Sequence, residues 1–122
     1  MNMPETKTYT GGCHCGAVRY EVQADLANTM VCNCSICTKR GSIMTFAGAD
    51  QFKLLKGGDV LKDYQFNKKL IHHMFCPTCG VESFANGTRP GDGAKMVAVN
   101  VRCLDGVDLD ALKPKKFDGR SV

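Results

Sequence analysis

Long apolar segments are missing from this sequence. None of its hydrophobic runs approaches the ~18 residues that a membrane-spanning helix requires. The N-terminal stretch MNMPETKTYT also lacks the apolar core of a secretory signal. We therefore expect a cytoplasmic protein that does not associate with membranes.

Amphipathic helical patterns and several common catalytic motifs are also missing. No window of ~12 residues or more repeats apolar residues at helical spacing, and only LDGVDLDALK (104–113) can form one short turn. The sequence has no glycine-rich phosphate loop, no Ser-His-Asp set and no spaced pair of carboxylates. These absences argue against a helical domain, a nucleotide-binding enzyme and a serine hydrolase.

Short alternating segments predict a mainly β fold of antiparallel sheets with little helix. In AVRYEVQ (17–23), three apolar residues alternate with polar ones, as in a half-buried strand. Further strands are expected at 43–47, 61–66, 69–75, 81–85 and 95–101, and glycines mark many of the turns. We expect one domain (1–122) that ends in a solvated tail (114–122).

Cysteine, in contrast, is abundant, with eight residues in the chain. Seven of them fall into three tight groups: Cys13/Cys15, Cys32/Cys34/Cys37 and Cys76/Cys79. A secreted protein of this size can use eight cysteines for disulfides. In the reducing cytosol, thiols this close in sequence are more typical of ligands that converge on a metal ion, so the grouping favours zinc.

The segment FCPTCG (75–80) has the composition of a zinc knuckle, with a proline that fixes φ and a glycine that permits a left-handed turn. A thioredoxin-type redox pair would need a helix after Cys79, whereas VESFA (81–85) is typical of a strand. The central group supplies three ligands by itself, and the other two groups supply two each. We therefore predict one closed four-cysteine site and one three-cysteine site with a free coordination position. Cys103 is interpreted as a packed thiol or, alternatively, as a fourth ligand of the three-cysteine site.

The segments GGCHCGAVRYEV, CNCSICTKRG, HHMFCPTCGVESF and VNVRCLD, with a terminal FDG, resemble the family of glutathione-dependent formaldehyde-activating enzymes, which includes relatives of centromere protein V. The resemblance covers about residues 9–119. It implies zinc-stapled antiparallel sheets of the β-tent type. It also implies two Zn²⁺ ions per chain: a structural zinc on Cys13, Cys15, Cys76 and Cys79, and a catalytic, more labile zinc on Cys32, Cys34 and Cys37.

The family reaction implied by this resemblance is the addition of glutathione to formaldehyde, which is a carbon–sulfur lyase reaction in reverse. Sulfur ligands donate electron density, so zinc on three thiolates activates water poorly but accepts a fourth thiol as thiolate. That thiolate can attack a small carbonyl carbon. The expected partners are therefore a small-molecule thiol and a carbonyl substrate.

Charged and titratable residues near the cysteines are further candidates. Lys39 and Arg40 follow the central group and can offset its negative charge or bind a substrate carboxylate; otherwise they are solvated loop charges. His72 and His73 precede the knuckle and must point to opposite faces if they lie on a strand. Either histidine can carry a proton to the developing alkoxide.

Two other functions are open on the sequence: a non-catalytic zinc-stabilised binding module for protein or nucleic acid, and a structural protein in which both zinc ions only brace the fold. Nucleic acid is the less expected partner, because seven zinc-bound thiolates bring the formal net charge of +4 close to zero. Most of the aromatic residues that could stack on bases also occupy core-like positions: the candidates are Tyr20, Phe46, Phe52, Tyr64, Phe66 and Phe84.

Overall fold

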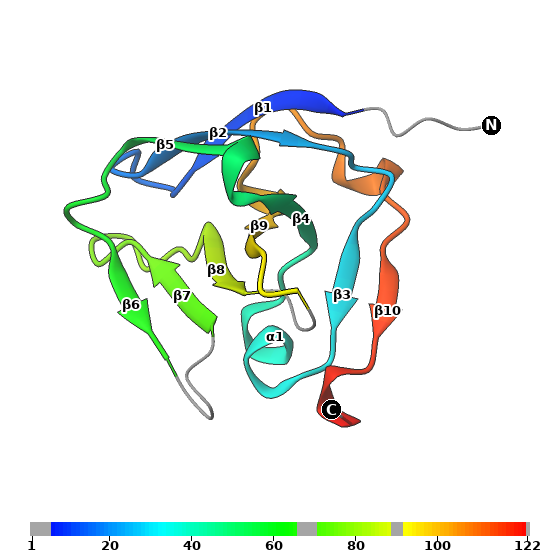
Figure 1. Cartoon of the computed structure of the whole chain (residues 1–122). Coiled ribbons are helices and arrows are strands. Elements are labelled where there is room, and N and C mark those ends of the chain that lie inside the picture. The colour runs from blue at the N-terminus through cyan, green and yellow to red at the C-terminus, as the bar shows by residue number, and fades with distance from the viewer. Residues whose placement is uncertain (1–5, 66–70, 89–91, 122) are drawn as a thin grey trace.

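The computed structural model describes residues 6–65, 71–88 and 92–121 of the chain. Within these residues the strands form two sheets (Figure 1). The smaller sheet has the order β1-β2-β5, with β1 at Lys7–Gly12, β2 at Arg19–Ala24 and β5 at Phe52–Lys56. The larger sheet has the order β10-β3-β4-β9-β8-β7-β6. Its strands are β3 (Met30–Cys32), β4 (Met44–Gly48), β6 (Lys62–Tyr64), β7 (Ile71–Phe75), β8 (Phe84–Thr88), β9 (Lys95–Asn100) and β10 (Lys115–Phe117).

Helical structure in the described part of the chain is limited to α1 (Ser35–Arg40) and four 3-10 turns, at Ala49–Gln51, Val101–Cys103, Leu109–Ala111 and Gly119–Ser121. The strand pairs are antiparallel apart from β10 with β3. The prediction of a mainly β fold of antiparallel sheets with little helix is therefore confirmed. No helix in the described residues is long and apolar enough to cross a membrane.

The six predicted strands all have counterparts in the described part of the chain, but one is shifted. Residue 66 of the strand predicted at 61–66 and residues 69–70 of the one predicted at 69–75 lie outside the described residues. Residues 81–85 were expected to form a strand, whereas β8 begins at Phe84. The reason is that the Cys76 N–H donates a 3.1 Å hydrogen bond to the Val81 carbonyl, so Val81 belongs to the turn that precedes the strand. Four strands, β1, β3, β5 and β10, lacked a clear signal in the sequence; two of them are three residues long.

Residues 115–117 of the expected solvated tail are exposed, but they form a strand that the sequence did not indicate. These residues form β10 and pair in parallel with β3, so that Phe117 lies opposite Cys32. The Asn33 N–H extends this pairing with a 3.2 Å hydrogen bond to the Phe117 carbonyl. The tail covers backbone groups of β3 that an edge strand would otherwise leave unpaired. The C-terminus therefore ends beside α1 and the end of β3 (Figure 1).

The core joins the two sheets through three aromatic rings. Tyr20 on β2, Phe52 on β5 and Phe84 on β8 lie with their ring centroids 4.7–5.7 Å apart. The Tyr20 hydroxyl donates a 3.3 Å hydrogen bond to the Ser83 carbonyl, which satisfies the polar end of a fully buried side chain. In Figure 1 the smaller sheet lies across the top, and α1 lies below it between β3 and β10 on one side and β6 and β7 on the other.

Candidate metal centres

The first cysteine cluster brings together the two loops that flank the core. The Sγ atoms of Cys13, Cys15, Cys76 and Cys79 all lie within 4.8 Å of one another. The Cys15 Sγ is 3.6 Å from both the Cys13 Sγ and the Cys76 Sγ. Four thiolates around zinc at about 2.3 Å form a tetrahedron with edges of about 3.8 Å. The donor set and its spacing therefore fit a closed zinc site.

The two loops of this cluster use the same local device. The Cys13 N–H donates to the Val18 carbonyl at 3.1 Å, and the Cys76 N–H donates to the Val81 carbonyl at the same distance. Each loop turns at a glycine with positive φ, +85° at Gly16 and +77° at Gly80. A residue with a side chain would be strained in this conformation. The result is two narrow turns that point their thiols at each other.

The thiols of this cluster have opposing pKa shifts. Backbone hydrogen bonds from Cys15 and Val81 lower the pKa of Cys79 to about 6. The amide of Ala17 lowers the pKa of Cys15, but the neighbouring Cys13 and Cys76 thiols outweigh it and raise this pKa to about 11. Thiolates this close repel one another, so the protons leave in turn. A divalent cation would remove this repulsion, because a coordinated thiol is deprotonated.

The second cluster consists of three cysteines around the start of α1. The Sγ atoms of Cys32, Cys34 and Cys37 lie within 4.8 Å of one another. Cys32 ends β3, Cys34 is the N-cap residue of α1, and Cys37 is buried one turn into the helix. The helix stops at Gly41, whose φ of +69° gives a left-handed cap. A strand end and a single helical turn thus present three ligands and leave a tetrahedral site one position short.

Burial and neighbouring thiols separate the pKa values of this cluster as well. Burial, followed by the adjacent Cys34 thiol, raises the pKa of Cys37 to about 12. Burial also acts on Cys34, but hydrogen bonds from the Cys37 amide and thiol outweigh it and lower the pKa of Cys34. The pKa of the thiol at the helix N-terminus is therefore lowered and that of the buried thiol raised, and a cation beside them would favour the thiolate form of both.

The C-terminal segment forms one wall of the three-cysteine cluster. The Asp118 carboxylate accepts a 2.8 Å hydrogen bond from the side-chain amide of Asn33, the residue between the first two ligands. A Cβ atom on Gly119 would lie 2.5 Å from the Cys32 Sγ and 3.2 Å from the Cys34 Cβ. The FDG segment therefore packs its backbone directly against the ligands. The sequence indicated FDG as part of the family resemblance and of the expected solvated tail, and not as a wall of this cluster.

Lys39 and Arg40, which the sequence analysis treated together, point to different surroundings. Lys39 is exposed and lines two shallow hollows of about 340 and 320 Å³ together with Ile36 and Tyr64; Arg40 and Glu82 line the smaller one as well. Arg40 is folded inward, where its guanidinium forms an ion pair with Glu82 and donates to the Cys37 Sγ at 3.4 Å. Arg40 is therefore not a solvated loop charge.

His72 and His73 point to opposite faces of β7, as a strand requires. His73 is buried on the side of α1, and its Nδ1 lies 3.2 Å from Glu82 Oε1. Burial, reinforced by the Arg40 charge, lowers the pKa of His73, so the ring is neutral near neutral pH. His72 is exposed, and its Nδ1 pairs with Asp63 at 2.7 Å.

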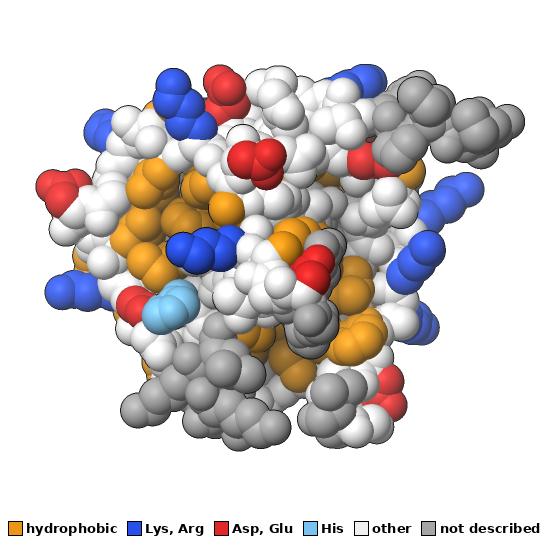
Figure 2. Space-filling model, viewed as in Figure 1, with side chains coloured by type: hydrophobic (Ala, Val, Ile, Leu, Met, Phe, Trp, Pro, Cys, Tyr) orange, Lys and Arg blue, Asp and Glu red, His pale blue; other side chains and the backbone are white. Residues whose placement is uncertain are grey.

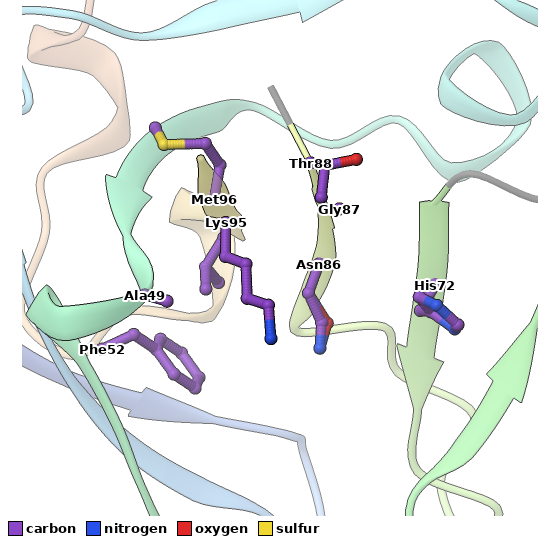
Figure 3. Close-up of a pocket in the computed structure, with 9 residues that line it drawn as sticks. Ala49, Phe52, His72, Asn86, Gly87, Thr88, Lys95 and Met96 are labelled. Atoms are coloured by element: carbon purple, nitrogen blue, oxygen red, sulfur yellow. The ribbon is translucent and has the colours of Figure 1, made fainter. Parts of the chain in front are cut away.

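His72 also borders a cavity of about 440 Å³ that is separate from both clusters. Figure 3 shows Asn86 and Lys95 projecting into this cavity beside the Phe52 ring. On this face, hydrophobic side chains are visible between β5 above and β6 and β7 below (Figure 2). None of the clustered cysteines lines the cavity, so His72 faces away from the candidate metal centres.

The remaining sequence candidates lie outside the two clusters. Cys103 is half-buried, burial raises its pKa, and its thiol joins neither group of potential ligands in the described residues. All eight cysteines are free thiols. Glu82 is the most important neighbour of Arg40 in this site, although nothing local to VESFA indicates that its carboxylate meets the guanidinium.

Comparisons with known proteins agree with this geometry. The family model described as glutathione-dependent formaldehyde-activating enzyme matches residues 8–118. Among solved structures, the crystal structure of a Rhodobacter sphaeroides protein from a structural genomics programme is 33% identical, with a TM-score of 0.78. The match covers 88% of this chain and 99% of that one. Since the family model spans both cysteine clusters and nearly the whole chain, the protein belongs to the family of glutathione-dependent formaldehyde-activating enzymes.

Proposed function

We propose that this protein is a zinc-dependent carbon–sulfur lyase-type enzyme, similar to S-(hydroxymethyl)glutathione synthase. In this proposal it binds a thiol such as glutathione at the three-cysteine cluster and adds it to formaldehyde or another small carbonyl compound. The observation that carries the proposal is the contrast between the two clusters, one with four convergent Sγ atoms and one with three. Four thiolates saturate zinc, whereas three leave a position for a substrate.

The two clusters are accordingly assigned different roles. Cys13, Cys15, Cys76 and Cys79 would hold a structural Zn²⁺ that fastens two loops far apart in the sequence. Cys32, Cys34 and Cys37 would hold a second, catalytic Zn²⁺. When bound there, the ion would supply a coordination position at which an incoming thiol is held as thiolate.

The reaction conserves atoms and electrons without a redox cofactor. The substrate thiol gives up its proton, and its sulfur forms a bond to the carbonyl carbon. The π electron pair of the carbonyl moves to the oxygen, which takes up a proton and becomes the hydroxyl group of the product. The reverse reaction breaks the same carbon–sulfur bond and releases the thiol and the aldehyde.

The hollows beside α1 are the candidate entrance for the substrate. They are lined by Ile36, Lys39 and Tyr64, on the outer side of the turn that carries Cys34 and Cys37. Lys39 is an exposed cation there and suits a substrate carboxylate. His73 is the better candidate of the two histidines for moving a proton, because it is neutral and lies on the side of α1, whereas His72 faces the other way.

The cytoplasm is the proposed location. A reducing compartment keeps thiolate clusters available for metal, and all eight cysteines of this chain are free. The reducing glutathione poise of the same compartment keeps a small-molecule thiol available. The proposed partners are therefore small molecules.

X-ray absorption at the zinc edge, on protein of measured metal content with and without glutathione, tests the proposal. We expect about two zinc ions per chain and a change from mixed sulfur and oxygen coordination to all-sulfur coordination when the thiol is added. The matched control is Cys32→Ser, which should lose one zinc and the response to glutathione. Exchange of ¹³C-formaldehyde into the glutathione adduct, followed by NMR, should be faster with the wild-type protein than with this variant.

Two all-sulfur or sulfur/nitrogen zinc ions that ignore glutathione would contradict the proposal. The three-cysteine cluster would then be closed by another side chain, and the protein would act as a zinc-stabilised binding module. Thiol binding without faster exchange of formaldehyde would instead retain the open site and exclude formaldehyde as the carbonyl substrate.

A further inference from the structure

The Arg40 side chain is surrounded by hydrogen-bonding groups, four of which accept from it whichever tautomer His73 adopts. Its guanidinium has five N–H donors, and five neighbouring groups lie within hydrogen-bond reach of its three nitrogen atoms. Nε donates to the Ser42 hydroxyl at 2.8 Å, and Nη2 lies 3.4 Å from the Cys37 Sγ and 3.3 Å from the Met44 Sδ. Nη1 meets the Glu82 carboxylate and the His73 Nδ1.

The ion pair between Arg40 and Glu82 is largely removed from solvent. The two side chains are 13% and 11% exposed, whereas the surface pair of Arg19 with Asp105 is 36% and 53% exposed. A buried cation next to a buried anion is held in one orientation, because turning either side chain would leave an uncompensated charge. Arg40 is therefore rigid by comparison with an exposed arginine.

The backbone at Glu82 is itself fixed by hydrogen bonds from Asn100. Its carbonyl accepts a 3.3 Å hydrogen bond from the Asn100 side-chain amide, and the following Ser83 carbonyl accepts from the Asn100 N–H at 2.9 Å. Glu82 also follows Cys79, a ligand of the four-cysteine cluster, by three residues. A short series of contacts therefore connects the two candidate metal centres. It runs along the chain from Cys79 to Glu82, through the ion pair to Arg40, and through the Arg40 hydrogen bond to Cys37.

Two consequences follow for the chemistry of Arg40. A hydrogen bond from a cation to a thiolate draws electron density from the sulfur and fixes the direction of its lone pairs. A guanidinium with its donors occupied and its charge matched by Glu82 has little left to offer a substrate carboxylate. This differs from the substrate-binding role considered for Arg40 on the sequence alone.

We propose that Arg40, fixed by Glu82, is a positioning residue that holds Cys37 in the geometry of the central metal site, and that it does not bind the substrate. The inference rests on the proposed metal at the three-cysteine cluster. It assigns the two neighbouring cations of α1 to different tasks. Lys39 lines both hollows as an exposed cation, whereas Arg40 also lines the smaller hollow but has its guanidinium engaged by Glu82 and Cys37.

The test compares Arg40→Gln with Lys39→Gln, which removes the same charge from the adjacent position of the same helix. Each variant, with wild type and Glu82→Gln, is loaded with Co²⁺ and titrated with a competing chelator. Thiolate-to-cobalt charge-transfer absorption reports each site, and Cys32→Ser supplies the spectrum of the four-cysteine site alone. Far-UV circular dichroism and a retained four-cysteine signal show that each variant is folded.

We expect Arg40→Gln to weaken Co²⁺ binding at the central site by about 10–100-fold and to shift its charge-transfer band. Glu82→Gln should also weaken Co²⁺ binding at the central site, whereas Lys39→Gln should bind Co²⁺ there with the wild-type affinity and spectrum. Equal central-site affinity and spectra for Arg40→Gln and Lys39→Gln would overturn the inference alone, as would an Arg40→Gln variant that keeps its metal but shows a raised KM for glutathione. A wild-type protein that binds no second Co²⁺ would overturn both the inference and the proposed function.

Discussion

The C-terminal backbone approaches the central cluster so closely at Gly119 that a single methyl group should disturb the metal site. An alanine Cβ there would lie 2.5 Å from the Cys32 Sγ and 3.2 Å from the Cys34 Cβ. Non-bonded heavy atoms prefer separations of about 3.5–4.0 Å, so the sulfur or the tail must move by about 1 Å. Ligand constellations tolerate displacements of about 0.5 Å. We expect Gly119→Ala to lower the metal affinity of the central cluster about 10–100-fold, or about 1.4–2.8 kcal/mol.

Chelator competition and the metal content after dialysis measure this effect. The matched control is Gly58→Ala, whose Cβ would meet only the end of the flexible Leu54 side chain, at 3.0 Å. The control should keep both metal ions, whereas Gly119→Ala should keep only the one at the four-cysteine cluster. Equal affinities for the two variants, with the Gly119→Ala tail released to proteolysis, would refute the reasoning that the tail is a wall of the site.

Three further predictions concern stability and metal content. Glu82→Gln breaks the buried ion pair and should lower the free energy of unfolding by about 3 kcal/mol, which lowers the Tm of the metal-loaded protein by about 12 °C. Asp105→Asn in the exposed pair should lower the Tm by less than about 4 °C. Equal Tm shifts in calorimetry would contradict this contrast. Burial lowers the pKa of His73 from its usual 6.5, so at mildly acidic pH the unfolded chain binds a proton on this ring more readily than the folded chain does. The free energy of unfolding should therefore fall as the pH drops below about 6.5. Urea titrations should show a smaller loss of this free energy between about pH 6.5 and 5 for His73→Gln than for wild type. Parallel pH profiles for the two proteins would rule out His73 as a cause. Cys76→Ser should unfold the domain, whereas Cys32→Ser should stay folded with one metal ion fewer, as circular dichroism and metal analysis will show.

The cysteine clusters were predictable because their determinants are local. Cysteines with only one or two residues between them share a turn, so Cys32, Cys34 and Cys37 converge largely independently of the rest of the fold. Cys13/Cys15 and Cys76/Cys79 each supply only two ligands, and pairing them was the simplest way to complete a tetrahedral set. The alternating pattern of 17–23 and 95–101 likewise predicted β2 and β9, because side chains alternate on any half-buried strand.

The surroundings of the central cluster could not be predicted in this way. Lys39 and Arg40 are adjacent, equally charged residues, and only the fold brings Glu82 close to Arg40 and leaves Lys39 exposed. The alternation of a strand predicted that His72 and His73 would diverge, but not which of them would face α1. The sequence by itself thus determined the candidate ligands and the chemistry that they permit, because coordination depends on residue type and short spacing. The tertiary structure alone decided which groups surround those cysteines. Glu82 meets Arg40 across 42 residues of sequence, and Asp118 meets Asn33 across 85. Contacts at such separations depend on sheet pairing rather than on any local pattern.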